Sequence, residues 1–287
     1  MKLFLGIIVF LCMVFFFIET GIRLIVRFIV PQYQSPTQIA KIYPSVSPTS
    51  SKPSPTPPVN PTEKEFGPCA TIPTLMYHHV EYYDKAKKEG HEKLTVNTPT
   101  FQSQMQYLHD HSYNPISMQQ LLDFFDKNIP LPPKPVLLTF DDGYEDFATD
   151  ALPILQKLNY PSTLFLPTAF ADRSGYVSWI WTKNNATLHT LIANHTWSHV
   201  ALQTTNTGER NQITKNEEDL KKYDIPTLPV FAYPYGQYDQ KAVNILFEKK
   251  YGLAFTTNQG SLLCKGKRLE PPRIRVGNSP LSAYGLN

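Results

Sequence analysis

The longest apolar stretch of the chain lies at its beginning. Residues 3–18 (LFLGIIVFLCMVFFFI) contain no charge, and residues 22–26 extend the run around Arg23. A helix of about 20 apolar residues crosses a bilayer, so the pattern predicts a transmembrane anchor over residues 1–30, with its arginines at the interface. A cleaved signal peptide is the alternative, although no small-residue cleavage site follows the run. The first interpretation predicts a membrane-anchored protein, and the second a secreted one.

A proline-rich segment follows and predicts a linker over residues 31–66. Its centre, Pro44–Pro61, reads PSVSPTSSKPSPTPPVNP and has too few apolar residues to form a core. As a polyproline-like spacer it would reach on the order of 50 Å. The positively charged residues after the apolar run favour a cytoplasmic domain. The spacer favours a domain outside the cytoplasm, held at a distance from the membrane. We give the spacer more weight than the charge pattern.

From residue 67 to residue 287 the pattern becomes that of a globular domain. Val136–Phe140 is a continuous apolar run, typical of a strand covered on both faces. A helical stripe follows over residues 147–158, and Ser162–Pro167 predicts the next strand. This order predicts an α/β fold with a parallel sheet covered by helices. Further strands are expected at residues 72–77, 230–233, 253–256 and 274–276, and further helices near residue 98 and at 241–249.

Charge argues against one class of function, nucleic-acid binding, and the cysteine content leaves a disulfide open. The chain has 27 Lys and Arg against 24 Asp and Glu, and it lacks the dense basic run that would predict nucleic-acid binding. Of three cysteines, Cys12 lies in the apolar run, whereas Cys69 and Cys264 flank the globular part. The latter two form a disulfide in an oxidising compartment or remain free thiols, and the sequence leaves both open.

The predicted strand at 136–140 ends in two adjacent carboxylates, Asp141 and Asp142. Ligands of α/β folds gather at the carboxyl ends of parallel strands, and neighbouring carboxylates in a dry pocket need a compensating cation. The segment NHTWSH supplies His195 and His199, whose spacing would place both on one side of a helical turn. We therefore expect Asp142 and the two histidines to hold one divalent ion with open positions, as catalytic ions have. Zinc suits these donors, and cobalt, nickel or iron would also bind.

Five segments, in this order, resemble the polysaccharide deacetylases, the NodB-homology carbohydrate esterases of family 4. They are Thr74–Val80 (TLMYHHV), Thr139–Gly143 (TFDDG), His195–His199 (HTWSH), Phe231–Gly236 (FAYPYG) and Arg273–Val276 (RIRV). The first, fourth and fifth resemble the poly-N-acetylglucosamine deacetylase branch. The resemblance spans roughly residues 70–280. It implies a distorted (β/α) barrel and metal-dependent removal of acetyl groups from a polysaccharide.

The resemblance also implies roles for individual residues. Asp141 would be the general base, and Asp142, His195 and His199 the metal ligands. The backbone N–H of Tyr235 would stabilise the oxyanion, together with the ion.

Two departures from the common family pattern concern the acid and the arginine. No histidine follows His199, so the C-terminal Leu-x-His acid of many members is missing. In the poly-N-acetylglucosamine branch the histidine of the Tyr-His motif serves instead, which here is His78, with His79 as the competing candidate. Ala232 stands where many members have an arginine, and the branch resemblance implies that Arg273 supplies that charge.

Three functions remain open at this level. They are an N-deacetylase on an N-acetylhexosamine polymer (poly-N-acetylglucosamine, peptidoglycan or a chitin-like chain), an O-acetyl esterase on a xylan-like glycan, and an inactive glycan-binding module. The following aromatic residues line a sugar groove or belong to the core: Trp179, Trp181, Trp197, Tyr233 and Tyr235. The histidines outside every motif are expected to be structural or exposed: His91, His109, His111 and His189.

Overall fold

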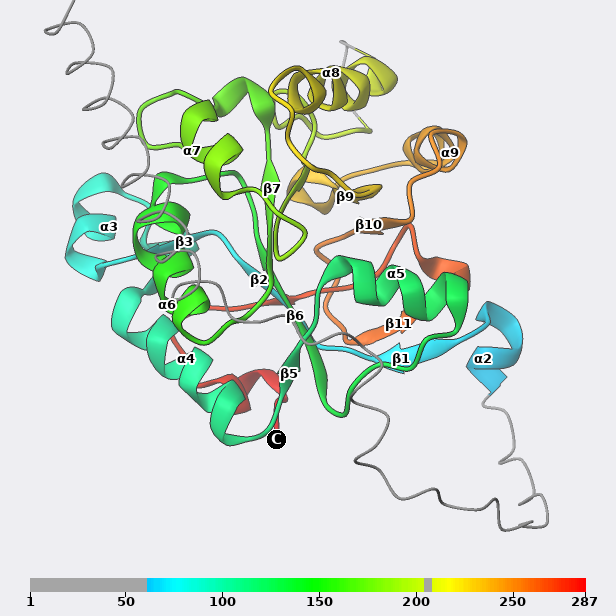
Figure 1. The fold of residues 1–287 in the computed structure, drawn as a ribbon, viewed down its shortest axis with the longest axis horizontal. Helices are drawn as coiled ribbons and strands as arrows, with labels where there is room; N and C mark the ends of the chain where they lie inside the picture. The colour runs from blue at the N-terminus through cyan, green and yellow to red at the C-terminus, as the bar shows by residue number, and fades with distance from the viewer. Residues whose placement is uncertain (1–60, 204–207) are drawn as a thin grey trace, which may run out of the picture. The chain divides into compact units, whose positions relative to one another are not determined.

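The computed structural model describes residues 61–203 and 208–287 (Figure 1). The predicted anchor over residues 1–30, and the predicted linker up to residue 60, lie outside the described residues. The last part of that linker forms helix α2 (Pro61–Phe66). Within the described ranges, no helix has the length and apolar character that crossing a bilayer requires.

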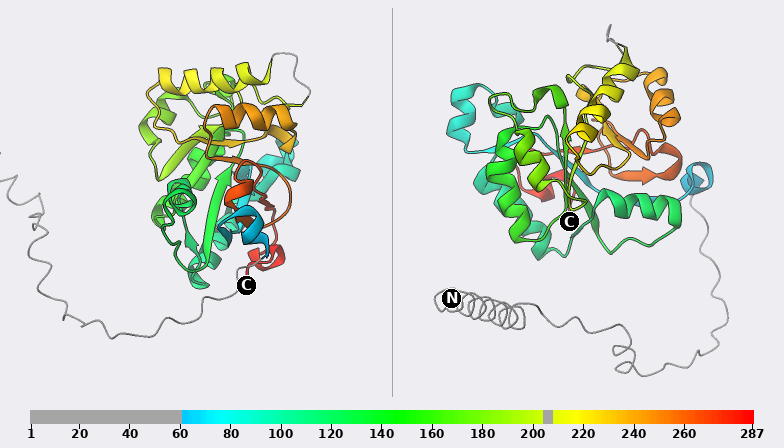
Figure 2. Two further views of the ribbon diagram at one scale, coloured as in Figure 1. Left: turned by 90° about the vertical axis from the view of Figure 1, so that its right-hand side faces the viewer. Right: turned by 45° about the horizontal axis from the view of Figure 1, so that its top comes forward.

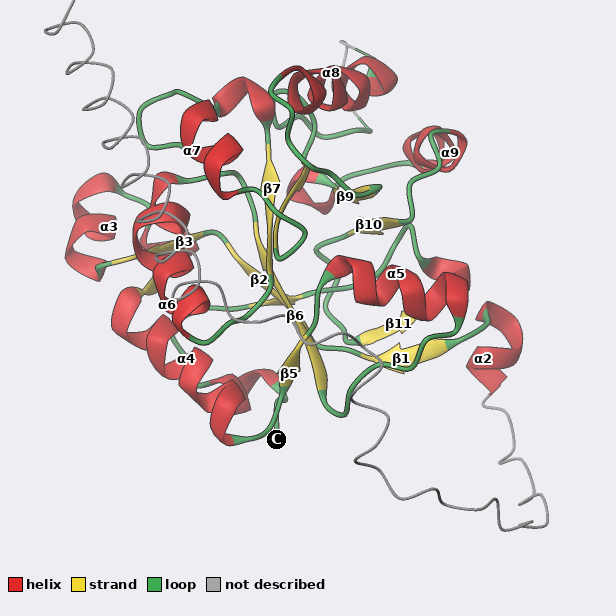
Figure 3. Ribbon diagram, viewed as in Figure 1, coloured by secondary structure: helices red, strands yellow, loops and turns green. Residues whose placement is uncertain are grey.

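A parallel sheet forms the centre of the domain, as the strand pattern predicted (Figure 3). Its strands run in the order β10-β9-β8-β7-β6-β2-β12, and β5 also pairs with β6. Every one of these pairings is parallel. The sheet stays open between β10 and β12, so the expected barrel is a half barrel. The strands are β2 (Thr74–Tyr77), β5 (Asn114–Pro115), β6 (Pro135–Phe140), β7 (Ser162–Leu166), β8 (Thr190–Asn194), β9 (Val230–Ala232), β10 (Leu253–Phe255) and β12 (Ile274–Arg275).

Helices cover both faces of the sheet. One face packs against α4, α6 and α7, with α8 and α9 side by side over β9 and β10 (Figures 1 and 2), and the other face packs against α5. The helices are α3 (Tyr83–Glu89), α4 (Thr98–Asp110), α5 (Met118–Lys127), α6 (Leu152–Lys157), which continues a π-helical turn at Phe147–Ala151, α7 (Trp179–Asn185), α8 (Glu209–Lys222) and α9 (Gln240–Glu248).

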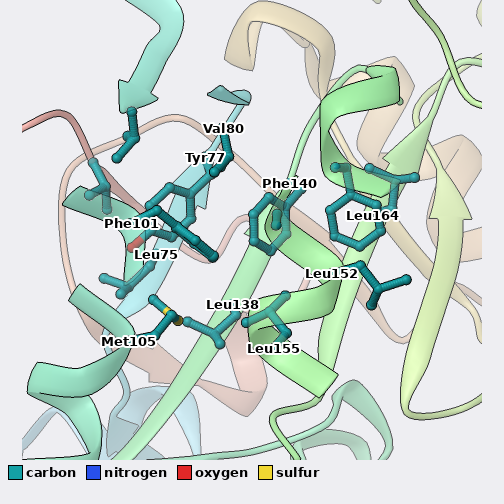
Figure 4. Packing of buried hydrophobic residues seen from close by; sticks show 14 of the residues in the cluster. Leu75, Tyr77, Val80, Phe101, Met105, Leu138, Phe140, Leu152, Leu155 and Leu164 are labelled. Atoms are coloured by element: carbon teal, nitrogen blue, oxygen red, sulfur yellow. The ribbon is translucent and has the colours of Figure 1, made fainter. Parts of the chain in front are cut away.

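The alternation of side chains along β6 divides the core into two layers. Leu138 and Phe140 pack with Phe101 and Met105 of α4 (Figure 4). Leu137, on the opposite face, packs in the cluster under α5. Successive strand residues point to opposite faces, so β6 is buried on both sides and reads as one apolar run. Its last residue is Phe140, which fixes the place where the following carboxylates emerge.

Two short sheets complete the domain. Strand β1 (Cys69–Thr71) pairs antiparallel with β11 (Leu262–Cys264), and the Cys69–Cys264 disulfide joins the pair. This answers the cysteine question in favour of the bridge. Strand β3 (His79–Glu81) pairs in parallel with β4 (Thr95–Asn97).

Three of the aromatic residues that the sequence left open pack in the core or against it. Trp179 stacks on Tyr223 with ring centroids 4.0 Å apart, and Trp181 meets Phe147 edge-on. Tyr233 is fully buried, and its hydroxyl donates to the carbonyl oxygen of Leu269. Trp179 and Tyr233 are buried and Trp181 is half-buried, so these side chains pack the helices against the sheet.

Candidate active site

The end of strand β6 separates the two adjacent carboxylates. Asp142 and Gly143 both have positive φ angles, of 74° and 76°. A Cβ atom at Gly143 would lie 2.3 Å from Cδ1 of Leu166, so glycine is required there. This sharp turn sends Asp141 toward Arg273 and Asp142 toward two histidines. Neighbours in sequence therefore acquire different partners.

Asp141 is held by Arg273, a buried arginine that immediately precedes β12. The Arg273 Nη1 and Nη2 atoms donate to the two carboxylate oxygens of Asp141, each at 2.7 Å. The guanidinium is fully buried and also donates from Nε to the carbonyl oxygen of Thr256 at 2.9 Å. Burial by itself would raise the pKa of Asp141, but the charge and hydrogen bonds of Arg273 outweigh it and lower that pKa. Asp141 is therefore an ionised carboxylate in a fixed orientation.

Asp142, His195 and His199 converge as the sequence predicted. Oδ1 of Asp142 lies 3.4 Å from Nε2 of His195 and 2.9 Å from Nε2 of His199. Burial opposes the charge of Asp142, but contact with the two imidazoles holds its pKa well below the usual value. One ligand atom from each residue lies within 4.8 Å of the others. Two imidazole nitrogens and a carboxylate oxygen form a donor set that fits a divalent transition metal.

The expected helical turn over the two histidines is wrong. Strand β8 ends at Asn194, and the segment HTWSH is a loop in which Thr196 and His199 have positive φ angles of 64° and 54°. Side-chain amides hold this loop: Oδ1 of Asn194 accepts from the Thr196 N–H at 2.9 Å, and Asn216 donates to the Thr196 carbonyl oxygen at 2.7 Å. Hydrogen bonds to these amides replace helical ones. Sequence reasoning did not single out either asparagine.

A backbone contact orients His195 toward the cluster. Its Nδ1 lies 2.7 Å from the carbonyl oxygen of Ala232 in β9. A carbonyl only accepts, so Nδ1 carries the proton and Nε2 is free to bind a metal. Ala232, which lacks the arginine expected from the common family pattern, thus orients His195 through its backbone carbonyl. This contact is a further reason why the three side chains fit an ion.

The neighbouring histidines of the Tyr-His motif face different surroundings. His78 is half-buried, and burial lowers its pKa, while the charges of Asp141 and Asp142 partly oppose that effect. His79 is buried and its Nδ1 contacts Oδ2 of Asp146 at 2.5 Å. Of the two candidates, His78 is the one that senses both carboxylates of the site.

Two tyrosines border the cluster. Tyr235, with 62% of its surface exposed and a positive φ of 59°, places its hydroxyl 3.2 Å from Nδ1 of His199. Tyr144 was not predicted, although it directly follows the Asp-Asp-Gly motif. Burial and the charge of Asp142 raise the pKa of Tyr144, and its ring stacks on His79 at 3.6 Å between centroids. Trp197, the remaining open aromatic, is half-buried under the ammonium of Lys215.

The amino-acid sequence of this chain is similar to sequences of known proteins. The model of the polysaccharide deacetylase family matches residues 128–255. The chain is 27% identical over 252 residues to the poly-beta-1,6-N-acetyl-D-glucosamine N-deacetylase of Escherichia coli (strain K12), covering 72% of this chain and 36% of that protein. It therefore spans little more than a third of that relative. Identity to the Staphylococcus aureus (strain MSSA476) protein of the same name is 23% over 232 residues, covering 71% of this chain and 78% of that one.

The fold of this chain is also similar to that of a solved deacetylase structure. The Streptococcus pyogenes deacetylase PplD, in complex with acetate, superimposes with a TM-score of 0.68 at 26% sequence identity. The match covers 76% of this chain and 99% of that chain.

Proposed function

We propose that this chain, which is similar to the polysaccharide deacetylases, is a hydrolase that removes N-acetyl groups from an N-acetylhexosamine polymer. The observation that carries the proposal is the pairing of two unlike carboxylates at one strand end. Asp142 meets two imidazoles, whereas Asp141 meets Arg273 and stays ionised. A divalent ion, for which zinc is our proposal, would lie among Asp142, His195 and His199. Held there, it would polarise the acetamide carbonyl and lower the pKa of the attacking water.

Asp141 has the properties of a general base. Its carboxylate is buried, ionised and fixed by two hydrogen bonds from Arg273. It would take a proton from the attacking water as the new C–O bond forms at the acetamide carbon. Arg273 acts through Asp141 and is therefore a positioning residue. Its charge keeps the base in the ionised form that can accept a proton.

The leaving amine needs a proton when the C–N bond breaks, and we assign its delivery to His78. The half-buried imidazole lies where Asp141 and Asp142 both influence its charge. Burial lowers the pKa of His78, so its protonated form is a stronger acid than a free histidine. The products are acetate and a free amino sugar. One proton of the attacking water passes to Asp141, and the other is lost when the new carboxyl group ionises to acetate. The amine takes its proton from His78, and exchange with solvent returns Asp141 and His78 to their starting states.

Tyr235 is our candidate for the oxyanion contact. It lies in the short helical turn Pro234–Gly236 after β9, and its hydroxyl reaches His199. The Tyr235 N–H would donate to the oxygen that becomes negative in the tetrahedral intermediate. A Cβ at Gly236 would lie 2.0 Å from Oγ1 of Thr257, so glycine is required for this turn.

For the polymer, we propose β-1,6-linked N-acetylglucosamine, because two relatives with that named substrate match across more than two thirds of this chain. We further propose that the catalytic domain acts outside the cytoplasm. The Cys69–Cys264 disulfide supports an oxidising compartment. The predicted anchor and linker would hold the enzyme at the cell surface.

The test measures acetate released by the purified full chain from three substrates, each with and without a chelator. They are β-1,6-linked and β-1,4-linked N-acetylglucosamine oligosaccharides and acetylated xylan. We expect chelator-sensitive release that is fastest from the β-1,6-linked amide. Release mainly from the β-1,4-linked amide would overturn the linkage, and release mainly from xylan would overturn the amide assignment in favour of an O-acetyl esterase. No release from any substrate by metal-loaded protein would favour a glycan-binding module.

A further inference from the structure

A second group of imidazoles and carboxylates lies outside the proposed active site. His79 and Glu81 come from β3, and His91 lies between α3 and the short helical turn Glu92–Leu94. One ligand atom from each lies within 4.8 Å of the others. Nδ1 of His91 is 2.9 Å from Oε1 of Glu81, and Nδ1 of His79 is 4.0 Å from the same oxygen. The donor set is the one found at the active site, two imidazoles and a carboxylate.

Negative charge around these residues exceeds the fixed positive charge. Asp146 contacts Nδ1 of His79 at 2.5 Å, and Glu89 contacts Nε2 of His91 at 3.1 Å. Among the described residues, one lysine pairs with this group: Lys85, whose exposed ammonium lies 3.0 Å from Oε2 of Glu81. The histidines not counted, three carboxylates (Glu81, Glu89 and Asp146) face one ammonium. Glu81 and Asp146 are buried, so the unbalanced charge is costly unless a cation joins them.

The same residues line a cavity of about 260 Å³. His79, Glu81, His91 and Asp146 form part of its wall, and Tyr144 and Tyr176 close another part. The imidazoles of His79 and His91 stack with centroids 4.0 Å apart. The cavity thus combines space, converging donors and a deficit of positive charge.

We propose that His79, Glu81 and His91 bind a second divalent transition-metal ion, distinct from the ion at Asp142. Imidazole nitrogens and one carboxylate oxygen suit zinc and its neighbours in the first transition series. Asp146 accepts the Nδ1 proton of His79, so Nε2 is the nitrogen of His79 that would bind the ion, and Asp146 would orient the ring. Oδ1 of Asp146 also accepts from the backbone N–H of Val80 at 2.9 Å, which fixes the carboxylate in place.

Tyr144 connects this second site with the active site. Its ring stacks on His79 at 3.6 Å, and it directly follows Gly143 in the turn that carries Asp142. An ion that fixes His79 therefore also fixes the ring beside a proposed catalytic ligand. The second ion has a structural role, because it would hold the segment 79–91 against the turn of the Asp-Asp-Gly motif.

The experiment counts zinc ions bound by the full chain. Protein is stripped with a chelator, titrated with Zn²⁺ alone in a calorimeter, desalted, and analysed for metal content. We expect two ions per chain for the wild type and one for Asp142→Asn. We also expect one ion for His91→Gln and one for Glu81→Gln. A matched control, His189→Gln, replaces an exposed histidine outside both groups and should retain two.

Thermal unfolding of each variant, without and with zinc, checks that it folds. The proposal also predicts that zinc raises the melting temperature of Asp142→Asn, which retains only the second site, and that His91→Gln in the same background abolishes that rise. It is overturned if His91→Gln and Glu81→Gln bind as many ions as the wild type, or if Asp142→Asn binds none. In that case the imidazoles are protonated and pair with the carboxylates directly. None of these readings depends on acetate release, so failure of the proposed function would be seen separately.

Discussion

The two histidine–carboxylate groups of this protein are assembled in opposite ways. At the candidate active site, Asp142 and the pair His195 and His199 follow different strands, β6 and β8, and are more than fifty positions apart in the chain. In the second group, His79, Glu81 and His91 all lie within one short segment. A parallel sheet brings the ends of distant strands together, so the first group depends on the whole fold. The second depends on β3 and the turn after α3.

Replacing a ligand should separate the two groups most strongly. We expect His195→Ala to lower kcat/KM for acetate release on the order of 10⁴-fold, because several kcal/mol of transition-state stabilisation depend on the ion. His91→Gln should cause a much smaller loss, because its group lies beside the reaction and not in it. Steady-state acetate assays on both variants, with zinc in excess, give the comparison. Equal losses would contradict the division of roles.

The two adjacent carboxylates, Asp141 and Asp142, should respond differently to the same substitution. Asp141→Asn should lower kcat about 10³-fold through loss of the general base, with zinc content unchanged. Asp142→Asn should lose the ion as well as the activity. Activity assays paired with metal analysis distinguish these outcomes. If Asp141→Asn also lost its zinc, Asp141 would be a ligand and the assignment of the base would be wrong.

His78 and His79 are sequence neighbours that face different groups, so they form a matched pair. His78→Gln should lower kcat about 10²-fold and remove the alkaline limb of the pH profile. The protonated acid is lost as pH rises through its pKa, which burial lowers. His79→Gln should keep that limb. A profile in which the limb disappears only in His79→Gln would exchange the two roles.

Arg273 should have the smallest effect and a distinctive pH signature. Arg273→Gln should lower kcat about tenfold, a loss of roughly 1.4 kcal/mol of transition-state stabilisation, because Arg273 acts only through the orientation and charge of Asp141. The arginine now lowers the pKa of Asp141 against burial, so its removal raises that pKa. The base is lost as pH falls through its pKa, and the acidic limb should therefore move to higher pH. An unmoved limb, in a variant that folds, would show that Arg273 does not act through Asp141.

The sequence predicted the strands and the convergence of Asp142, His195 and His199 because each carries a strong local signal. The apolar run before Asp141 predicted β6, and the ordered motifs predicted the group at Asp142. The loop at His195 was misjudged because i, i+4 spacing fits a helix and also fits a turn whose positive φ angles the residue types do not reveal.

The roles of Asn216, Tyr144 and His91 were not predicted, because they depend on tertiary contacts. Asn216 holds the Thr196 carbonyl from α8, and Tyr144 is placed by the turn at Gly143. His91 appeared unrelated to any motif, because its nearness to Glu81 depends on how α3 returns the chain to β3. An alternating His-x-Glu on a short strand was the one available signal, and it is weak.

Anomalous diffraction at the zinc absorption edge, from crystals of the zinc-loaded protein, tests the central claim most directly. We predict a strong peak bonded to Asp142, His195 and His199, with the carboxylate of Asp141 still paired to Arg273 and not bonded to the metal. Loaded crystals with no peak among these three side chains, or with the ion bonded to Asp141, would contradict the account.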